Sequence, residues 1–261
     1  MHYAVAIWNW VTEEARLPEL IEEFVGFGYD AVSLSTAHLG RLEQAEVAAG
    51  AELVVEREVP VTLHGAVTVE PEALVQASEM FGKRLTCVTF DPCLVMEPRG
   101  RLYDAERMAP VVEGVLELPS QPRVGIEDFP LDQMAVDWFA DDLASVLDHP
   151  RYGILIDIGH MNMRLHGGGY FEGMSVTEYI ERVPLPMIEV HVHDNDGTRD
   201  AHAPLGEGTI DFAEVADALR SAGFDGMSTI EIAPTLHGRD PAKCRSAARE
   251  GLEHWRTLWE D

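Results

Sequence analysis

Histidines and carboxylates crowd one stretch of this sequence, Ile188–Phe212, which begins with alternating β-branched residues and ends in a glycine-rich turn. Its ionisable side chains include His191, His193, Asp194, Asp196, Asp200 and His202. Neutral imidazoles and carboxylates are ligands that divalent cations take in proteins, so this stretch predicts a metal site at the end of a strand. An acidic loop in contact with solvent is the alternative.

Ionisable residues also end other strand-like segments. Apolar and polar residues alternate in Val61–His64, Val124–Asp128, Ile154–Asp157, Ile188–His193 and Met227–Glu231. Because successive side chains of a strand point to opposite faces, we expect the apolar set under helices and the polar set toward a shared axis. Burying several carboxylates together is costly unless a cation neutralises them. A metal-free network of Glu–His hydrogen bonds is the alternative to a cation.

Strand-length apolar segments alternate with helical segments along the whole chain. Tyr3–Asn9, Ala31–Thr36 and Leu85–Asp91 add three strands to the five above, which makes eight strand–helix units. Regular alternation implies a parallel sheet, and eight units imply a closed (β/α)₈ TIM barrel, a single α/β domain over residues 1–261. A doubly wound open sheet is the competing fold. No GxGxxG or Walker-type loop follows the first strand, so no dinucleotide or nucleoside triphosphate site is expected.

The chain carries a large excess of negative charge. Its 261 residues include 46 Asp and Glu against 19 Lys and Arg, a net charge of −27. Such a surface repels a phosphate backbone, so nucleic acid is not the expected partner. No apolar run approaches the roughly 20 residues that span a bilayer, and no basic segment precedes an apolar one at the N-terminus. We therefore expect a cytoplasmic protein with no membrane contact, and leave a homo-oligomer open.

Four segments resemble the xylose isomerase-like TIM-barrel superfamily. They are VGIEDFP (Val124–Pro130), ILIDIGHMN (Ile154–Asn162), HVHDNDGTRDAHAPLGEG (His191–Gly208) and TIEIAP (Thr229–Pro234). This superfamily groups sugar and sugar-phosphate isomerases and epimerases with endonuclease IV-type enzymes (AP endonuclease family 2). The similarity in strand order and motif spacing covers nearly the whole chain. Its more specific motifs are the Asp157–His160 pair and the run from Asp200 to Gly208.

The resemblance implies a set of metal ligands. In the epimerase branch a single cation would be held by Glu127, Asp157, His191 and Glu231. The endonuclease-like branch implies further ligands at His64, His160, Asp200 and His202. That branch also has a histidine after the fourth strand, where this chain has Asp91. The chain therefore departs from a complete three-zinc pattern at Asp91, which is itself a candidate ligand.

Three kinds of reaction fit these ligands. We expect isomerisation or epimerisation of a sugar or sugar phosphate, with Mn²⁺, Co²⁺ or Mg²⁺ stabilising an enediolate while Glu127 and Glu231 take and return the proton. A phosphodiester hydrolase with two or three Zn²⁺ is the alternative. A lyase acting on a keto-sugar or cyclitol would share the metal–enediolate start. The acidic composition and Asp91 favour the isomerase.

Several side chains are candidates for direct contact with a carbohydrate. We expect His160 and His193 to hydrogen-bond its oxygens. Trp8 and Asn9 end the first expected strand, where an aromatic face could stack on a sugar ring. For Trp8, packing at the barrel rim is the alternative.

Overall fold

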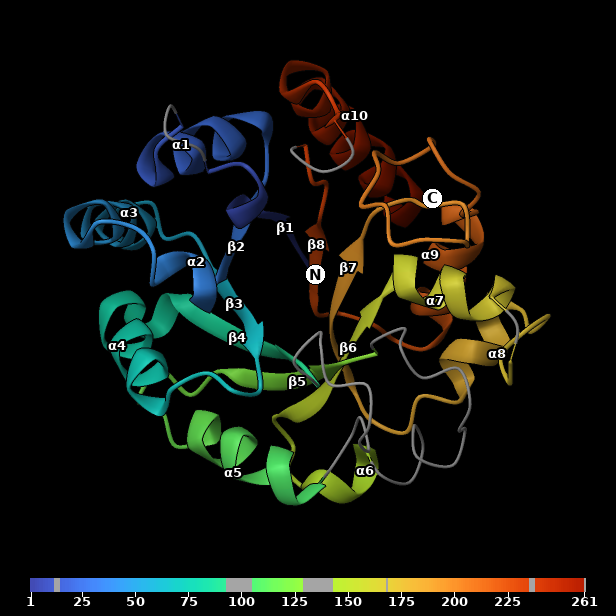
Figure 1. Ribbon diagram of the computed structural model, residues 1–261, viewed down its shortest axis with the longest axis horizontal. Coiled ribbons are helices and arrows are strands. Elements are labelled where there is room, and N and C mark those ends of the chain that lie inside the picture. The colour runs from blue at the N-terminus through green and yellow to red at the C-terminus, as the bar shows by residue number, and fades with distance from the viewer. Residues whose placement is uncertain (12–14, 93–104, 129–142, 168, 235–237, 261) are drawn as a thin grey trace.

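The computed structural model describes residues 1–11, 15–92, 105–128, 143–167, 169–234 and 238–260. Within these ranges, eight strands form a closed barrel in sequence order, and helices surround it (Figure 1). The strands are β1 (His2–Ala6), β2 (Ala31–Ser35), β3 (Val61–Ala66), β4 (Leu85–Asp91), β5 (Arg123–Glu127), β6 (Tyr152–Asp157), β7 (Met187–Val192) and β8 (Met227–Ile230).

All neighbouring strands run parallel, and β1 pairs with β8 to close the ring. Tyr3 lies opposite Ser228 in this closing pair. The predicted (β/α)₈ barrel is therefore confirmed, and the open doubly wound sheet is excluded, because an open sheet has two edge strands that pair on one side only, whereas every strand here pairs on both sides.

Helices connect successive strands on the outside of the barrel (Figure 1). They are α1 (Leu17–Phe27), α2 (Thr36–Leu39), α3 (Gln44–Glu56), α4 (Pro71–Phe81), α5 (Ala105–Leu116), α6 (Leu143–Val146), α7 (Ile158–His166), α8 (Val176–Glu181), α9 (Phe212–Ser221) and α10 (Pro241–Glu260). Two 3₁₀ helices, η1 (Ile7–Asn9) and η2 (Gly82–Arg84), complete the described elements. Among them, no helix combines the length and the apolar character that crossing a membrane requires.

Helix α1 shows how local sequence sets these elements. A proline stands in its first turn, where the backbone N–H it lacks would have no partner within the helix. Leu17, Leu20, Ile21 and Phe24 are buried on one face, as their spacing predicts. Gly28 ends the helix at φ 105°, a conformation that glycine adopts without strain, and its N–H bonds back to the last turn.

Strand alternation divides the side chains between two environments. The apolar set is fully buried and belongs to the core cluster (Val61, Leu63, Val124, Ile126, Ile154, Ile156, Val190, Val192 and Ile230). In the polar set, Thr62 and Thr229 both hydrogen-bond Glu189, so side chains from β3, β7 and β8 meet inside the barrel. These bonds place that polar layer on the axis, as the alternation predicts.

The first strand is shorter than expected. It ends at Ala6, and Trp8 and Asn9 lie in η1 rather than in the strand. The N–H of Trp10 bonds back to Ile7, and the indole of Trp10 is buried with its centroid 5.0 Å from the ring of Phe24. The chain therefore turns at Ile7–Asn9, and this turn places Trp10 against Phe24 of α1.

Candidate metal centre and active site

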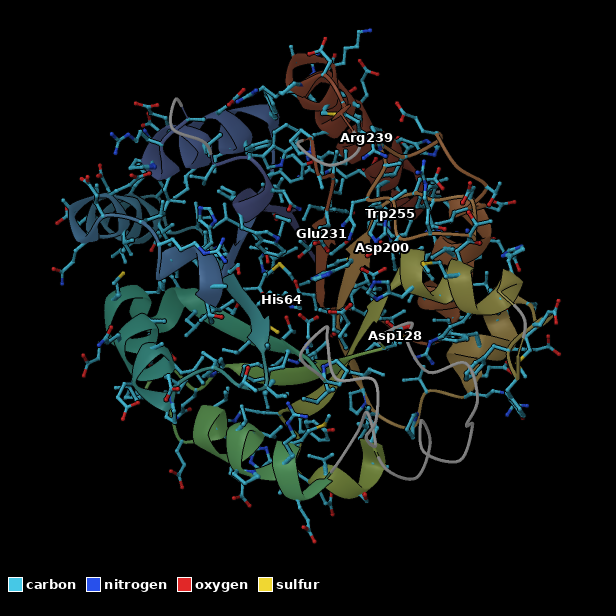
Figure 2. All side chains as sticks on the ribbon, in the orientation of Figure 1. His64, Asp128, Asp200, Glu231, Arg239 and Trp255 are labelled. Carbon is cyan, nitrogen blue, oxygen red and sulfur yellow. The ribbon has the colours of Figure 1, made fainter. Side chains whose placement is uncertain are left out.

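Six ionisable residues lie at or near the carboxyl ends of six successive strands. They are His64 on β3, Asp91 on β4, Glu127 on β5, Asp157 on β6, His191 on β7 and Glu231 just after β8. Figure 2 shows His64, Asp200 and Glu231 toward the middle of the ring of strands. This end of a (β/α)₈ barrel is where the loops build active sites.

Asp157, His191 and Glu231 form one fully buried group of donors. The Nδ1 atom of His191 lies 2.7 Å from Glu231 Oε2 and 3.7 Å from Asp157 Oδ2. One ligand atom from each residue lies within 4.8 Å of the others. This is the spacing that a single cation needs, and these are three of the four ligands that the sequence predicts.

Glu127, the fourth predicted ligand, belongs to a neighbouring group with Asp157 and His160. Its Oε1 atom lies 2.8 Å from His160 Nδ1, which in turn is 3.9 Å from Asp157 Oδ1. Asp157 is thus common to both groups. The four side chains expected to hold one cation are therefore divided between two groups that share Asp157, and none of the groups among the described residues contains all four.

Glu127 also joins a third group, with His64 and Asp91. His64 Nε2 lies 3.4 Å from Asp91 Oδ1 and 3.5 Å from Glu127 Oε2. The other ring nitrogen of His64 faces Thr89 Oγ1 at 3.0 Å, which fixes the ring orientation. Asp91 therefore occupies a donor position here, even though the nuclease pattern has histidine after the fourth strand.

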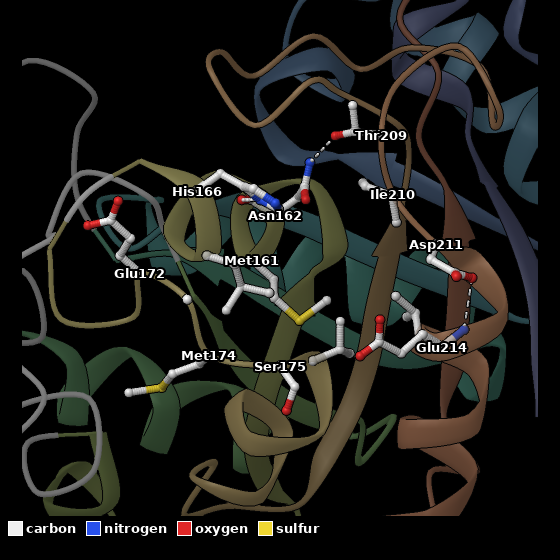
Figure 3. Close-up of a pocket in the computed structure, with 14 residues that line it drawn as sticks. Met161, Asn162, His166, Glu172, Met174, Ser175, Thr209, Ile210, Asp211 and Glu214 are labelled. Atoms are coloured by element: carbon white, nitrogen blue, oxygen red, sulfur yellow. Dashed lines mark hydrogen bonds between the residues drawn. The ribbon is translucent and has the colours of Figure 1, made fainter.

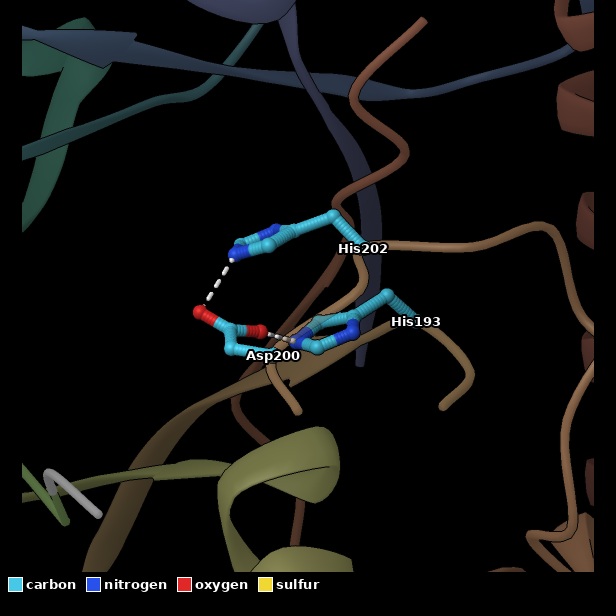
Figure 4. A group of neighbouring side chains, drawn as sticks. All are labelled: His193, Asp200 and His202. Atoms are coloured by element: carbon cyan, nitrogen blue, oxygen red, sulfur yellow. Dashed lines mark hydrogen bonds and ion pairs between the residues drawn. The ribbon is translucent and has the colours of Figure 1, made fainter. Parts of the chain in front are cut away.

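The fourth group comprises His193, Asp200 and His202 (Figure 4). Asp200 Oδ2 lies 3.0 Å from His202 Nε2, and Oδ1 lies 3.7 Å from His193 Nε2. His160 Nε2 approaches the same carboxylate at 3.4 Å and so links this group to Glu127. The four groups form one continuous network.

Carboxylates in the Asp157 group favour the ionised form. Burial opposes ionisation of Asp157, but His160, His193 and His191 together outweigh it and hold the pKa of Asp157 well below its usual range. Burial likewise opposes charge on Glu231, yet His191 lowers the pKa of Glu231 to about 2. Burial lowers the pKa of His191, but the negative charges of Glu231 and Glu189 outweigh burial and raise that pKa well above its ordinary value. Protons on the imidazoles thus balance the buried carboxylates.

Glu127 behaves differently. Burial and the negative charge of Asp91 raise the pKa of Glu127 to about 8. Burial disfavours the charged form of His64, but Asp91 outweighs it and raises the pKa of His64 to about 8. A divalent cation at these donors would replace protons as the neutralising charge. The donor set of carboxylates and imidazoles fits such a cation.

Supporting residues fix the orientation of Asp157. Its backbone N–H donates to Asp128 Oδ1 at 2.7 Å, while Tyr179 OH donates to Asp128 Oδ2 at 2.7 Å. Its side chain caps α7 by accepting from the N–H of His160. Gly159 leaves room for His193, because a Cβ at that position would lie 2.0 Å from the imidazole.

A buried carboxylate also holds the loop that carries Asp200 and His202. Asp194 accepts hydrogen bonds from the N–H groups of Gly206, Gly208 and Ile210 at 2.8–3.3 Å. A Cβ at Gly208 would come within 2.2 Å of Asn195 O and Asp194 Oδ1, so the close turn requires glycine there. Asp194 thus accepts hydrogen bonds from backbone N–H groups, whereas the sequence suggests it as a cation ligand.

Asp196 is the second correction within Ile188–Phe212. Its Oδ1 atom accepts from both the N–H and the hydroxyl of Thr198, and its side chain is exposed. A cation-sized group is a set of at least three side chains whose ligand atoms all lie within 4.8 Å of one another, and within the described residues neither Asp194 nor Asp196 belongs to one. The other four expected donors of this stretch do belong to such groups.

The four expected substrate contacts lie in different surroundings. His193 is fully buried, with Nε2 3.0 Å from Asp157 Oδ1, and His160 is almost as buried against Glu127. The indole of Trp8 stacks on His64 with centroids 5.7 Å apart and an interplanar angle of 17°. Asn9 Nδ2 is buried and has no hydrogen-bond partner in the described part of the chain.

Residues 21–258 match the model of the family described as "Xylose isomerase-like TIM barrel". The chain belongs to this family.

Relatives of this xylose isomerase-like chain include sugar epimerases. The chain is 31% identical over 134 residues to an uncharacterised protein of Methanocaldococcus jannaschii, covering 50% of this chain and 43% of that one. It is 30% identical over 89 residues to the fructoselysine 3-epimerase of Shigella flexneri, covering 34% and 31%. The matched stretches thus span less than half the length of these relatives.

Solved structures share the fold of this family member across its length. A D-tagatose 3-epimerase-like protein superposes with a TM-score of 0.69 at 20% identity, covering 98% of this chain and 99% of that one. The D-psicose 3-epimerase of Clostridium cellulolyticum H10 superposes with a TM-score of 0.71 at 13% identity, covering 99% of both chains. At these identities the likeness establishes the fold.

Sequence reasoning missed the supporting roles of Asp128, Tyr179 and Glu189. Asp128 follows Glu127 directly, but its partners Tyr179 and Asp157 lie 51 and 29 positions away. The strand alternation does place Glu189 on the face of His191. That position could have identified it as a second buried carboxylate beneath the site.

A separate cavity of about 480 Å³ is bordered by α7, by residues that lead into α8 and by the start of α9 (Figure 3). Met161, Met174 and Ile210 supply apolar surface, and Glu172 and Glu214 supply carboxylates. None of the cation donors named above lines it. The cavity and the candidate metal centre therefore share no donor residue.

Proposed function

We propose that this protein is a divalent-metal-dependent isomerase or epimerase of a sugar or sugar phosphate. The observation that carries the proposal is a pair of donor groups at the mouth of the barrel, Asp157–His191–Glu231 and Glu127–Asp157–His160, which share Asp157. The names of its relatives, among them fructoselysine 3-epimerase, support the same class of substrate.

In this proposal Asp157, His191, Glu231 and Glu127 hold one Mn²⁺, Co²⁺ or Mg²⁺. When bound, such a cation polarises the carbonyl and hydroxyl oxygens of the sugar and stabilises the negative charge that develops as a proton leaves carbon. Asp128 and His193 orient Asp157, because they bond its backbone and its carboxylate. His160 orients Glu127 in the same way, by contact with its Oε1 atom.

Glu127 and Glu231 are assigned to proton transfer. They come from β5 and from the residue after β8, so β6 and β7 separate them in the ring. A sugar across the mouth would lie between the two carboxylates. One carboxylate removes the proton next to the carbonyl, and an enediolate forms. The opposite carboxyl group, which is protonated when the substrate binds, then donates its proton to the other face of that carbon and inverts its configuration. The first group keeps the proton that it removed, and exchange with solvent restores the starting protonation.

His193 takes an orienting role in this proposal rather than the direct substrate contact expected from the sequence. Its ring is fully buried, and Nε2 is directed at Asp157. Trp8 remains assigned to the sugar, since its half-buried ring lies beside His64. Asn9 also keeps that assignment, because its Nδ2 atom is a donor for which the described residues supply no acceptor.

Solvent exchange tests the proposed chemistry directly. Metal-loaded protein is incubated in D₂O with a panel of ketoses, with and without phosphate, and products are analysed by NMR. One solvent deuteron on the inverted carbon is expected. Glu231→Gln should lower turnover by about 10²- to 10⁴-fold while far-UV circular dichroism stays native. The exposed Glu178 provides a matched control as Glu178→Gln.

Near-native turnover in Glu231→Gln would remove its assigned role. Product without solvent deuterium across the whole panel would argue against proton exchange at carbon.

A multinuclear phosphodiester hydrolase is the second candidate. The observation that favours it is the presence of further cation-sized groups, His64–Asp91–Glu127 and His193–Asp200–His202, beside the first. Two or three clustered cations could activate water and hold both oxygens of a phosphodiester. The net charge of −27 opposes a nucleic acid substrate. Metal stoichiometry distinguishes the two candidates.

A further inference from the structure

A fully buried carboxylate lies inside the barrel beneath the proposed metal centre. Glu189 stands in the middle of β7 and has no exposed surface. Its Oε2 atom accepts from Thr62 Oγ1 at 2.6 Å, and its Oε1 atom accepts from Thr229 Oγ1 at 2.6 Å. Thr62 belongs to β3, which lies opposite β7 in the ring. Glu189 is therefore held from both sides in one orientation.

His191 lies two residues further along the same strand and points to the same face. Its Nδ1 atom faces the proposed cation site, 2.7 Å from Glu231. Its Nε2 atom is buried and has no partner within hydrogen-bonding distance in the described ranges. Glu189 Oε1 lies 3.6 Å from that atom, slightly beyond a normal hydrogen bond.

These contacts bear on the tautomer of His191. A neutral imidazole carries one N–H donor and one lone pair, and only the lone pair can bind a cation. Carboxylates face both ring nitrogens of His191, Glu231 at Nδ1 and Glu189 at Nε2, so both nitrogens can be protonated when no cation is bound. When a cation takes the place of the Nδ1 proton, Glu189 keeps the other proton on Nε2 and leaves the Nδ1 lone pair to the cation. Histidines that bind metals commonly donate their second ring N–H to a carboxylate, which fixes the ring and strengthens the ligand.

We propose that Glu189 is a positioning residue that holds the Nε2–H tautomer of His191 and thereby makes Nδ1 a metal ligand. This inference rests on the metal centre of the proposed function. Burying an ionised carboxylate costs free energy unless donors or positive charges compensate for the lost water. Orientation of His191 gives Glu189 a role that an apolar side chain could not fill.

Variants at Glu189 separate positioning from packing. Glu189→Met keeps a similar length and removes the acceptor, whereas Glu189→Gln keeps a neutral acceptor. The control is Ser33→Ala, because Ser33 is also fully buried and lies opposite Thr62 in the strand register. Zn²⁺ affinity is measured by competition with a chromophoric chelator, and thermal unfolding of the metal-free proteins is measured in parallel.

The positioning role predicts a graded order of affinity. Glu189→Met should bind Zn²⁺ about 10- to 100-fold more weakly than the wild type, Glu189→Gln should fall between them, and Ser33→Ala should bind like the wild type. Wild-type affinity in folded Glu189→Met would overturn the inference while leaving the metal centre intact. Failure of the wild type to bind Zn²⁺ would instead overturn the metal centre, and the inference with it.

A second measurement needs no variant at Glu189. Long-range ¹H–¹⁵N NMR of the Zn²⁺-loaded wild type reports which ring nitrogen of His191 carries the proton, with the signal assigned by its loss in His191→Gln. The expected result is a proton on Nε2 that exchanges slowly with solvent. A proton on Nδ1 would overturn the proposal even if the Glu189 variants failed to fold.

Discussion

The imidazole rings of His193 and His202 lie face to face, with centroids 4.2 Å apart and an interplanar angle of 11°. Both rings direct Nε2 toward the carboxylate of Asp200. Burial disfavours charge on His202, but Glu231 and Asp200 outweigh it and raise the pKa of His202 to about 9. A proton on His202 can thus balance the charge of Asp200 when no cation is bound.

Metal stoichiometry therefore tests whether the His193–Asp200–His202 group binds a cation. The proposed epimerase should retain one Mn²⁺ per chain, as measured by elemental analysis after exhaustive dialysis. Asp200→Asn should keep that one ion, because Asp200 lies outside the Asp157–His191–Glu231 group. Two or three ions in the wild type, with one lost in Asp200→Asn, would favour the hydrolase instead.

Cation affinity should increase with pH. The pKa of Glu127 is about 8 and that of His191 is raised well above its usual value, so protons compete for these ligands at neutral pH. As pH rises toward 8 fewer protons must be displaced, and as pH falls below 8 more must be displaced. We expect about a tenfold change in apparent Kd per pH unit for each proton released. Titration calorimetry in buffers of different ionisation enthalpy measures that number, and an affinity that is flat from pH 6 to 8 would contradict it.

Tyr179→Phe should destabilise the protein through Asp128. The hydroxyl of Tyr179 donates to Asp128 Oδ2, and burial already raises the pKa of Asp128 to about 7. Without that donor, a buried carboxylate oxygen loses a partner, at a cost of about 1–3 kcal/mol in the free energy of unfolding. Urea denaturation measures the change. Tyr170→Phe is the control, since Tyr170 is 43% exposed, and an equal loss in both variants would refute the assignment.

Gly159→Ala should displace His193. The added Cβ would lie 2.0 Å from the ring, and the start of α7 cannot move without disturbing the Asp157 cap. We expect a loss of about 1–3 kcal/mol in unfolding free energy together with weaker cation binding. Gly114→Ala in α5 is the control, because a Cβ there meets nothing within 4 Å. The assignment fails if Gly159→Ala retains both properties.

Strand periodicity made much of the fold and site predictable. Glu127, Asp157 and His191 lie on strands whose alternation fixes the face of every side chain, so position along the chain determined where they point. Tertiary contacts decided the remaining details. Trp8 and Asn9 left the first strand because the packing of Trp10 against Phe24 accompanies a turn at Ile7–Asn9.

Loop residues were harder to place from composition. Asp194 and Asp200 have the same side chain, yet Asp194 binds backbone N–H groups 12 to 16 residues ahead. These bonds depend on how the chain turns at Gly206 and Gly208. The alternation of apolar and polar residues along the strands does not predict that turn. The supporting contact of Asp128 with Tyr179 likewise joins segments that only the folded chain brings together.

Pairing of β1 with β8 closes the ring, and Glu231 follows β8 immediately. During synthesis, the segment that carries Glu231 emerges from the ribosome after every other proposed ligand. A nascent chain that ends before β8 can offer Asp157 and His191 but not the carboxylate that completes their group. In the proposed metal centre, loading of the cation therefore follows translation of the eighth strand, and a product truncated before β8 would lack the Glu231 carboxylate.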